Sequence, residues 1–195
     1  MLKIKLNSQR DEHLIGNLTS FHSFSYASQI QPEWMSFYSL KVFSECFLKP
    51  NEQFNHSLSY TFFKLIPIEG QLDILCRSHG KSSLDLYSPL ELNRSQAESV
   101  SFKNNSHKIS RFFLLESNLP IEVEIISIEK GNSLTLDSIN MPLWCHLIEG
   151  HLEMVYHRDI LALESSSGFS LEANNEVHLK SLEDTKAILC RVPIS

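Results

Sequence analysis

One seven-residue pattern occurs twice in this chain of 195 residues, and it constrains the fold more than any other feature. The first copy lies within Leu65-Ile66-Pro67-Ile68-Glu69-Gly70-Gln71-Leu72-Asp73-Ile74, and the second lies within Cys145-His146-Leu147-Ile148-Glu149-Gly150-His151-Leu152-Glu153-Met154. Each copy reads Ile-Glu-Gly-x-Leu followed by an acidic and an apolar residue, and Glu69 and Glu149 are 80 positions apart. Self-similarity at a long spacing is typical of a duplicated structural unit. The sequence therefore predicts two copies of one unit.

The segments around these motifs have the pattern of β-strands. They are short, rich in aromatic residues and often alternate between apolar and polar side chains. Strands are predicted at 37–48, 60–68, 72–76, 110–115, 121–128, 143–148, 152–156, 177–179 and 187–192. The Glu-Gly pairs predict tight turns, because glycine readily adopts positive φ. The Ser- and Asn-rich stretch 77–110 is expected to be a long loop or a poorly ordered connection, with 88–100 as the one place for a short helix.

Composition excludes several functions. The formal net charge is −6 and the sequence pI about 5.8, which argues against nucleic-acid binding, since phosphates are neutralised by clustered Lys and Arg. The four cysteines show no Cys-x-x-Cys spacing, and we expect reduced, buried thiols. No stretch approaches the roughly 20 apolar residues that span a bilayer, and the start lacks a signal-peptide pattern. We expect a soluble cytoplasmic protein without a membrane partner.

A mostly β chain with two tandem copies predicts a bicupin, two double-stranded β-helix (jelly-roll) barrels in one chain. We place the barrels at residues 1–118 and 119–195. The run Phe21-His22-Ser23-Phe24-Ser25-Tyr26, then Pro32-Glu33-Trp34-Met35-Ser36-Phe37 and Leu40-Lys41-Val42, resembles the opening of pirin-family proteins, which have a similar His-Ser-Phe-Ser-Phe run, a Met-Gly-Phe stretch and a Leu-Arg-Val strand. The resemblance is good from about residue 21 to 74, poor from 76 to 118 and moderate from 121 to 193.

The resemblance implies an N-terminal barrel that holds one divalent, iron-like metal ion with three histidines and a glutamate. It also implies quercetin 2,3-dioxygenase activity, which has been linked to bacterial relatives, or contact with nuclear transcriptional cofactors, as for the human protein. A dioxygenase site of this kind needs neutral imidazoles and a carboxylate around a redox-active ion with open coordination positions.

The sequence departs from the pirin family at the implied ligands. Counted back from Glu69-Gly70, the family's His-x-His positions carry His56 and Leu58. When the strand at 110–115 is aligned with that of the family, the His-x-Glu positions fall near Val100 and Phe102. We therefore expect no metal cofactor. If a divalent metal binds, a shifted alignment would supply His56 with Glu98 and His107, although these lack the i, i+2 spacing that places two ligands on one strand face. His56 itself is either a remnant of the old site or a histidine hydrogen-bonded to a neighbouring backbone group.

Two functional hypotheses of different class follow. The first is a pirin-like bicupin that has lost its metal site and binds a small apolar or aromatic molecule, or an unidentified protein; its candidate pocket comprises His56, Leu58, Phe62, Lys64 and Phe102. Lys64 is an even number of positions from His56, so strand alternation would place both on the same face. Its side chain is then expected either inside the barrel or at the barrel mouth. The second is a metal-dependent quercetin 2,3-dioxygenase-type oxidoreductase. The sequence identifies no catalytic residue for either, and whether the chain is an enzyme stays open.

The remaining histidines are expected to be structural or solvated. His22 follows an aromatic residue and is expected to pack or to form hydrogen bonds. The four histidines of the second copy lack the i, i+2 spacing of a ligand pair, and among them only the one in Trp144-Cys145-His146 alternates with buried-type residues; they are His146, His151, His157 and His178. No Gly-x-Ser-x-Gly, P-loop or Gly-x-Gly-x-x-Gly motif is present, and nothing in the spacing of the carboxylates predicts an acid–base dyad.

Overall fold

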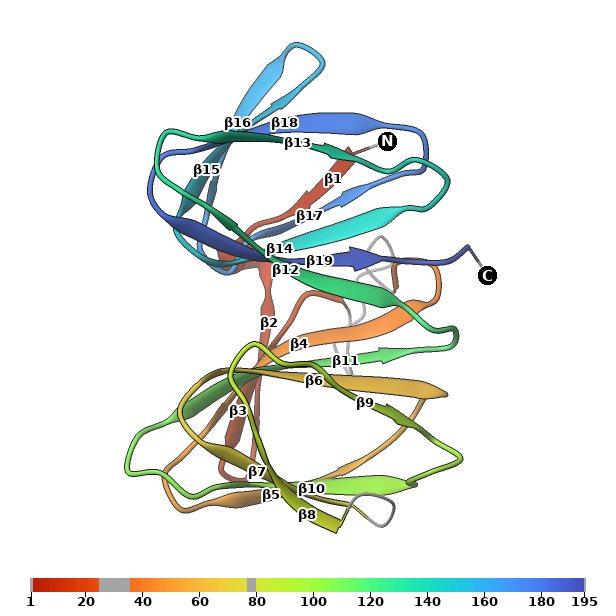
Figure 1. Ribbon diagram of the computed structural model, residues 1–195, viewed down its shortest axis with the longest axis vertical. Helices are drawn as coiled ribbons and strands as arrows, with labels where there is room; N and C mark the ends of the chain where they lie inside the picture. Colours follow the sequence, from red (N-terminus) through yellow and green to blue (C-terminus); the bar gives the residue numbers. More distant parts are fainter. Residues whose placement is uncertain (1, 25–35, 77–79, 195) are drawn as a thin grey trace. The chain divides into compact units, whose positions relative to one another are not determined.

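The computed structural model describes residues 2–24, 36–76 and 80–194, and in these residues it contains strands, one short 3₁₀ turn and no α-helix (Figure 1). The part of the pirin resemblance between Ser25 and Met35 lies outside the described residues. None of the described residues belongs to a helix long and apolar enough to cross a membrane. The mostly β prediction is confirmed.

The strands divide between two units. In the first they are β2 (Asp11–Ile15), β3 (Leu18–His22), β4 (Leu40–Leu48), β5 (Gln53–Ser57), β6 (Phe62–Glu69), β7 (Leu72–Cys76), β8 (Gly80–Leu84), β9 (Leu90–Asn93), β10 (Ser99–Asn104) and β11 (Ser110–Ser117). In the second they are β1 (Leu2–Lys5), β12 (Glu122–Ile128), β13 (Ser133–Asp137), β14 (Leu143–Glu149), β15 (His151–Tyr156), β16 (Asp159–Glu164), β17 (Gly168–Leu171), β18 (Glu176–Ser181) and β19 (Thr185–Arg191), with the 3₁₀ turn η1 (Asn7–Gln9).

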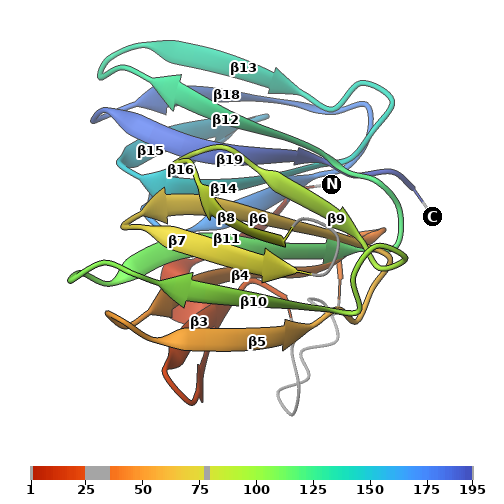
Figure 2. The same ribbon diagram turned by 60° about the horizontal axis from the view of Figure 1, so that its bottom comes forward.

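Each unit consists of two antiparallel sheets. The N-terminal barrel has the strand orders β2-β3-β4-β11-β6-β9 and β5-β10-β7-β8, and the C-terminal barrel has β1-β17-β14-β19-β12 and β13-β18-β15-β16. Figure 2 shows β5, β10 and β7 side by side in the first barrel. Adding eight to each strand number turns β5-β10-β7-β8 into β13-β18-β15-β16, and β4-β11-β6-β9 into β12-β19-β14-β17. The two barrels therefore repeat one jelly-roll topology, as the duplicated motif predicts.

The division of the chain differs from the expected one at the N-terminus. One compact unit comprises Asp11–Pro120, and the other comprises the residues from Ile121 onward together with the segment that ends at Arg10. β1 pairs with β17, with Leu2 opposite Leu171 and Ile4 opposite Phe169. The first strand thus adds an edge to the C-terminal barrel, whereas the sequence placed it in the N-terminal one; the boundary near residue 119 is shifted by only two residues.

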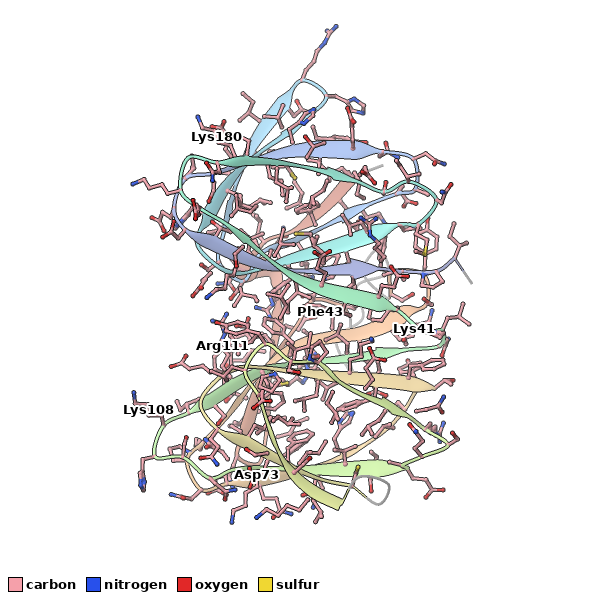
Figure 3. All side chains as sticks on the ribbon, in the orientation of Figure 1. Lys41, Phe43, Asp73, Lys108, Arg111 and Lys180 are labelled. Atoms are coloured by element: carbon pink, nitrogen blue, oxygen red, sulfur yellow. The ribbon has the colours of Figure 1, made fainter. Side chains whose placement is uncertain are left out.

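The apolar core of each barrel lies between its two sheets. In the N-terminal barrel the core includes Phe63, Leu65, Phe102, Phe112 and Leu114, and in the C-terminal barrel an equivalent cluster is built mainly from Leu side chains. Side chains fill the space between the facing sheets of each barrel (Figure 3). Alternate residues of each strand point into this space, as the period of two in a β-strand requires.

All nine strands predicted from the sequence are present, as β4, β6, β7, β11, β12, β14, β15, β18 and β19. The described part of 77–110 is not irregular, because it forms β8, β9 and β10, and a short helix at 88–100 is wrong. Leu90–Asn93 pairs instead with β6, and Ser99–Asn104 pairs with both β5 and β7. These strands are short and polar, so their local pattern is weak, and pairing with neighbours determines their structure.

Candidate functional site

His56 lies in the interior of the N-terminal barrel. On β5 the residues Phe54 and His56 are half-buried, whereas the residues between and beside them are exposed. The imidazole of His56 lies among three phenylalanines, with ring centroids 5.8 Å from Phe63 and 6.5 Å from both Phe54 and Phe102. The alternation of β5 therefore points His56 inward.

Glu116 is the partner of His56, and sequence reasoning missed it. Oε1 of Glu116 lies 2.8 Å from Nε2 of His56, and the exposed fractions of the two side chains are 1% and 13%. Oε2 accepts hydrogen bonds from the backbone N–H groups of Ser59 at 2.7 Å and Tyr60 at 2.9 Å. A carboxylate is acceptor-only, so Nε2 of His56 carries the hydrogen of this bond. The sequence signal for this residue was its position, because Glu116 is an acidic residue directly after the apolar run Phe112-Phe113-Leu114-Leu115.

The positions of the implied metal ligands are mostly apolar. Val100 lies opposite His56 and Phe102 lies opposite Phe54 in the register of β10 with β5. The exposed fractions of Leu58, Val100 and Phe102 are 3%, 1% and 0%, and all three belong to the barrel core. Among the described residues no group of three or more His, Cys, Asp or Glu side chains is arranged to hold a metal ion. These residues do not fit a three-histidine, one-glutamate site.

The second ligand set from the sequence is not brought together. Glu98 precedes the first residue of β10, and His107 lies in the turn that follows its last residue; both side chains are exposed. A strand of this length spans about 20 Å, so the two residues lie at opposite ends of the barrel. Lys108, next to His107, lies at the tip of the β10–β11 turn (Figure 3). The structure therefore places His56, Glu98 and His107 at three separate positions.

The predicted pocket is only partly formed. His56, Leu58 and Phe102 face the barrel interior, but Phe62 and Lys64 do not. Phe63 and Leu65 occupy the inward positions of β6, so strand alternation turns Phe62 and Lys64 to the other face. There the ammonium group of Lys64 pairs with the carboxylate of Glu91 on β9. The sequence analysis gave Lys64 the same strand face as His56. This is wrong because residues 58–61 form a loop between β5 and β6, so the alternation of β5 does not continue into β6.

A small cavity lies beside His56, with a mostly apolar lining that also includes His22 and two serines. His22 is buried there, with Nε2 3.0 Å from Oγ of Ser20 and Nδ1 2.6 Å from Oγ of Ser44. The cavity volume is about 30 Å³, close to the space one water molecule occupies. Its walls are Ile15, Leu18, Ser20, His22, Val42, Ser44, Cys46, Phe54, His56 and Leu114. His22 is a hydrogen-bonded core residue, as expected, but the sequence did not show that it shares a cavity with His56.

The C-terminal barrel has no histidine at the position equivalent to His56. In the common topology His56 and Val100 correspond to Leu136 and Val177, which are paired in the same register and buried. Three of its histidines are exposed: Nδ1 of His151 lies 3.1 Å from Glu183, Nδ1 of His178 lies 2.8 Å from Oγ1 of Thr135, and His157 forms the β15–β16 turn. The fourth, His146, is buried on β14.

Three carboxylates that could have formed an acid–base pair lie apart. Glu45 contacts Nε of Arg111 at 2.6 Å, Glu52 contacts Asn17 at 2.6 Å, and Asp73 contacts Asn105 at 2.5 Å and Lys81 at 3.5 Å. Each has its own partner on a different part of the barrel. The Glu116–His56 pair, in contrast, is an acid–histidine contact inside the N-terminal barrel.

No protein-family model matches the sequence, and a comparison with curated proteins found no match. Solved structures do match over the whole chain. The bacterial pirin YhhW of Escherichia coli, in complex with nickel(II), gives a TM-score of 0.82 at 14% sequence identity and covers 100% of both chains. An oxalate decarboxylase formate complex from Lactobacillus farciminis gives 0.75 at 8% identity and covers 98% of this chain and 86% of its own.

A putative glyoxylate-induced protein of Pseudomonas aeruginosa is also similar, with a TM-score of 0.75 at 11% identity, over 97% of this chain and 88% of its own. At such identities the similarity concerns the fold. The duplicated jelly-roll topology and the agreement over the full length of YhhW lead to one conclusion: this chain has the bicupin fold, the fold of the bacterial pirin YhhW.

Proposed function

We propose that this pirin-like bicupin works without the family's metal ion and binds a small apolar or aromatic molecule in its N-terminal barrel. The observation that carries the proposal is the replacement of implied ligands by core residues. Leu58, Val100 and Phe102 offer no electron pair to a metal, and they are fully packed. The remaining histidine, His56, already donates through Nε2 to Glu116.

This arrangement argues against dioxygenase chemistry. A redox-active ion with open positions for oxygen and substrate needs several nitrogen and oxygen ligands around one point. One imidazole and one carboxylate, both engaged with each other, do not supply that set. The metal-dependent quercetin 2,3-dioxygenase reading of the sequence therefore has less support than binding.

The barrel walls fit an aromatic ligand by chemistry. Phe54, Phe63, Phe102 and Phe112 surround the interior, and aromatic rings bind other rings by offset-stacked and edge-to-face contacts. The cavity of about 30 Å³ is much smaller than such a ligand. Binding therefore requires side chains at the barrel end to move apart. The alternative is that another protein binds to the surface of this chain, which requires no groove in the barrel.

The first experiment is elemental analysis of the full chain, purified without chelators or a histidine tag and again after incubation with Fe²⁺ or Ni²⁺ and desalting. We expect well below one metal ion per chain and no oxidation of a flavonol under air. About one retained ion per chain, with flavonol turnover that His56→Ala abolishes, would refute the proposal in favour of a dioxygenase. Native mass spectrometry of the same sample tests for a co-purified small molecule.

A further inference from the structure

The carboxylate of Glu116 joins three parts of the N-terminal barrel. Glu116 lies on β11 of the six-stranded sheet, and His56 lies on β5 of the four-stranded sheet. The second oxygen of Glu116 binds the backbone of Ser59 and Tyr60, which belong to the loop 58–61 between β5 and β6. One buried carboxylate thus ties both sheets and the loop through charge-assisted hydrogen bonds.

The loop 58–61 covers the apolar interior at this end of the barrel. Leu58 is 3% exposed and is part of the core, and Tyr60 packs against the same core. Apart from the bonds to Glu116, the backbone of the loop makes three hydrogen bonds to the segment before β10. The N–H of Leu58 donates to the carbonyl of Glu98 at 3.0 Å, the N–H of Arg94 donates to the carbonyl of Thr61 at 2.8 Å, and Nη1 of Arg94 donates to the carbonyl of Ser59 at 3.5 Å. Between β5 and β6 the loop belongs to no sheet, so it has no ladder of hydrogen bonds to hold it.

The side chains under this loop are those that an aromatic ligand would contact. Phe54, Phe63 and Phe102 surround His56, which also contacts the carboxylate of Glu116. Segments outside the sheet ladders open locally at a lower free energy than global unfolding, and such openings expose sites that are closed in the dominant state.

We propose that residues 58–61 form a lid that Glu116 latches shut, and that the barrel accepts an apolar aromatic ligand only when this latch is released. The proposal rests on the ligand-binding function proposed above. It assigns the carboxylate a role that is separate from metal binding, because the three groups it contacts are an imidazole N–H and two backbone N–H groups.

Amide hydrogen exchange of the full chain tests the latch. In the unmodified protein the amides of Ser59 and Tyr60 should exchange through local opening, faster than the amides of β11 and with little dependence on denaturant. Glu116→Gln removes the charge but keeps the size, and it should speed exchange at Ser59 and Tyr60 at least about tenfold, which corresponds to about 1.4 kcal/mol, with β11 unchanged. Glu98→Gln, at an exposed carboxylate beside the same loop, is the matched control and should change nothing.

Exchange of Ser59 and Tyr60 only through global unfolding in the unmodified protein would overturn the lid, even if Glu116→Gln failed to fold. Equal exchange in the Glu116→Gln and Glu98→Gln variants would overturn the latch.

Binding of 1-anilinonaphthalene-8-sulfonate tests the site beneath. We expect saturable binding at one molecule per chain, at least about fivefold tighter in Glu116→Gln than in Glu98→Gln. Equal affinity in the two variants would show that the lid does not control a site, whereas metal content and flavonol turnover decide the proposed function separately.

Discussion

Gly70 and Gly150 explain at the residue scale why the repeated motif contains glycine. Gly70 and Gly150 both have positive φ, +79° and +92°. The turn at Gly70 lies against the start of β11, and the turn at Gly150 lies against the start of β19. A Cβ at Gly70 would lie 2.7 Å from Oγ of Ser110, and one at Gly150 would lie 2.6 Å from the backbone oxygen of Asp184. Backbone strain and close approach of another strand thus act together at equivalent positions of the two barrels.

The first prediction concerns these glycines. Gly150→Ala should lower the free energy of unfolding by about 3 kcal/mol, because strain at positive φ adds to a clash with backbone atoms. Gly131→Ala is the control: Gly131 also has positive φ, +83°, but a Cβ there would meet nothing within 4 Å, so we expect a loss of about 1 kcal/mol. Urea unfolding of both variants measures the difference, and equal losses would contradict the role of close approach.

The second prediction concerns Cys145, which is buried like the other three cysteines. Burial raises the pKa of the Cys145 thiol far above its usual range, and the charge of Cys190 acts in the same direction. The native protein should therefore react with 5,5′-dithiobis(2-nitrobenzoate) only as it unfolds.

A raised folded-state pKa means that the neutral thiol favours the folded protein. This contribution is complete below the pKa of about 8.5 in the unfolded chain and is lost as the pH rises above it. The urea midpoint should accordingly fall between pH 7 and pH 9.5, and by less in Cys145→Val. An equal fall in Cys145→Val would contradict this assignment, and rapid labelling of the native protein would contradict its burial.

At the scale of elements, β1 shows how a distant segment completes a barrel. The strand pairs with β17, and the side chains of Leu2 and Ile4 pack against the C-terminal core. The sequence of β1 by itself does not indicate which of the two barrels the strand joins. Along the sequence, the whole N-terminal barrel lies between residues 2–10 and the rest of the C-terminal barrel.

The third prediction is that deletion of residues 2–6 destabilises the C-terminal barrel by about 2–3 kcal/mol, through lost apolar burial and lost strand pairing. Fluorescence of Trp144, on β14 next to β17, reports this unit in a Trp34→Phe background. Leu14→Ser is the control, since Leu14 on edge strand β2 is 69% exposed and its replacement should change stability by less than about 0.5 kcal/mol. An unchanged Trp144 transition in the deletion variant would show that β1 contributes nothing.

At the scale of the whole molecule, one topology holds two interiors with different chemistry. The N-terminal barrel keeps His56 with Glu116, whereas the equivalent position of the C-terminal barrel is Leu136. Both cores are otherwise apolar. Packing, together with buried hydrogen bonds such as those of His56 and His22 in the first barrel, is therefore expected to hold each barrel together without a metal.

The fourth prediction follows from this. A ligand that binds only the folded state raises its stability, so removal of a resident metal would lower the Tm. We expect the Tm of the full chain to change by less than about 1 °C on addition of a chelator, and likewise with excess Ni²⁺. A fall of several degrees with the chelator, reversed by metal, would contradict metal-free stability.

Much of the fold was predictable because it is encoded locally. The short apolar runs of β4, β6, β11 and β14 and the two Glu-Gly turns indicate strands and duplication without reference to any neighbouring strand. The short polar strands β8 and β10 were not predictable, since their backbone hydrogen bonds depend on partners elsewhere in the chain. Of the candidate site, His56 and Leu58 were located by counting from the motif and Phe102 by aligning the next strand with that of the pirin family, and all three lie inside the barrel, whereas Phe62 and Lys64 lie on the other face.

The sequence by itself determined the strand content, the duplicated unit and the apolar character of three implied ligand positions, because these depend on residue identity and on the period of a strand. Only the tertiary structure decided that Glu116 meets His56, that β1 belongs to the C-terminal barrel and that the loop 58–61 covers the interior. The physical reason is sequence separation: His56 and Glu116 are 60 residues apart and lie on different sheets, so no local pattern links them. Closure of the barrel brings them together and buries the carboxylate with its three donors.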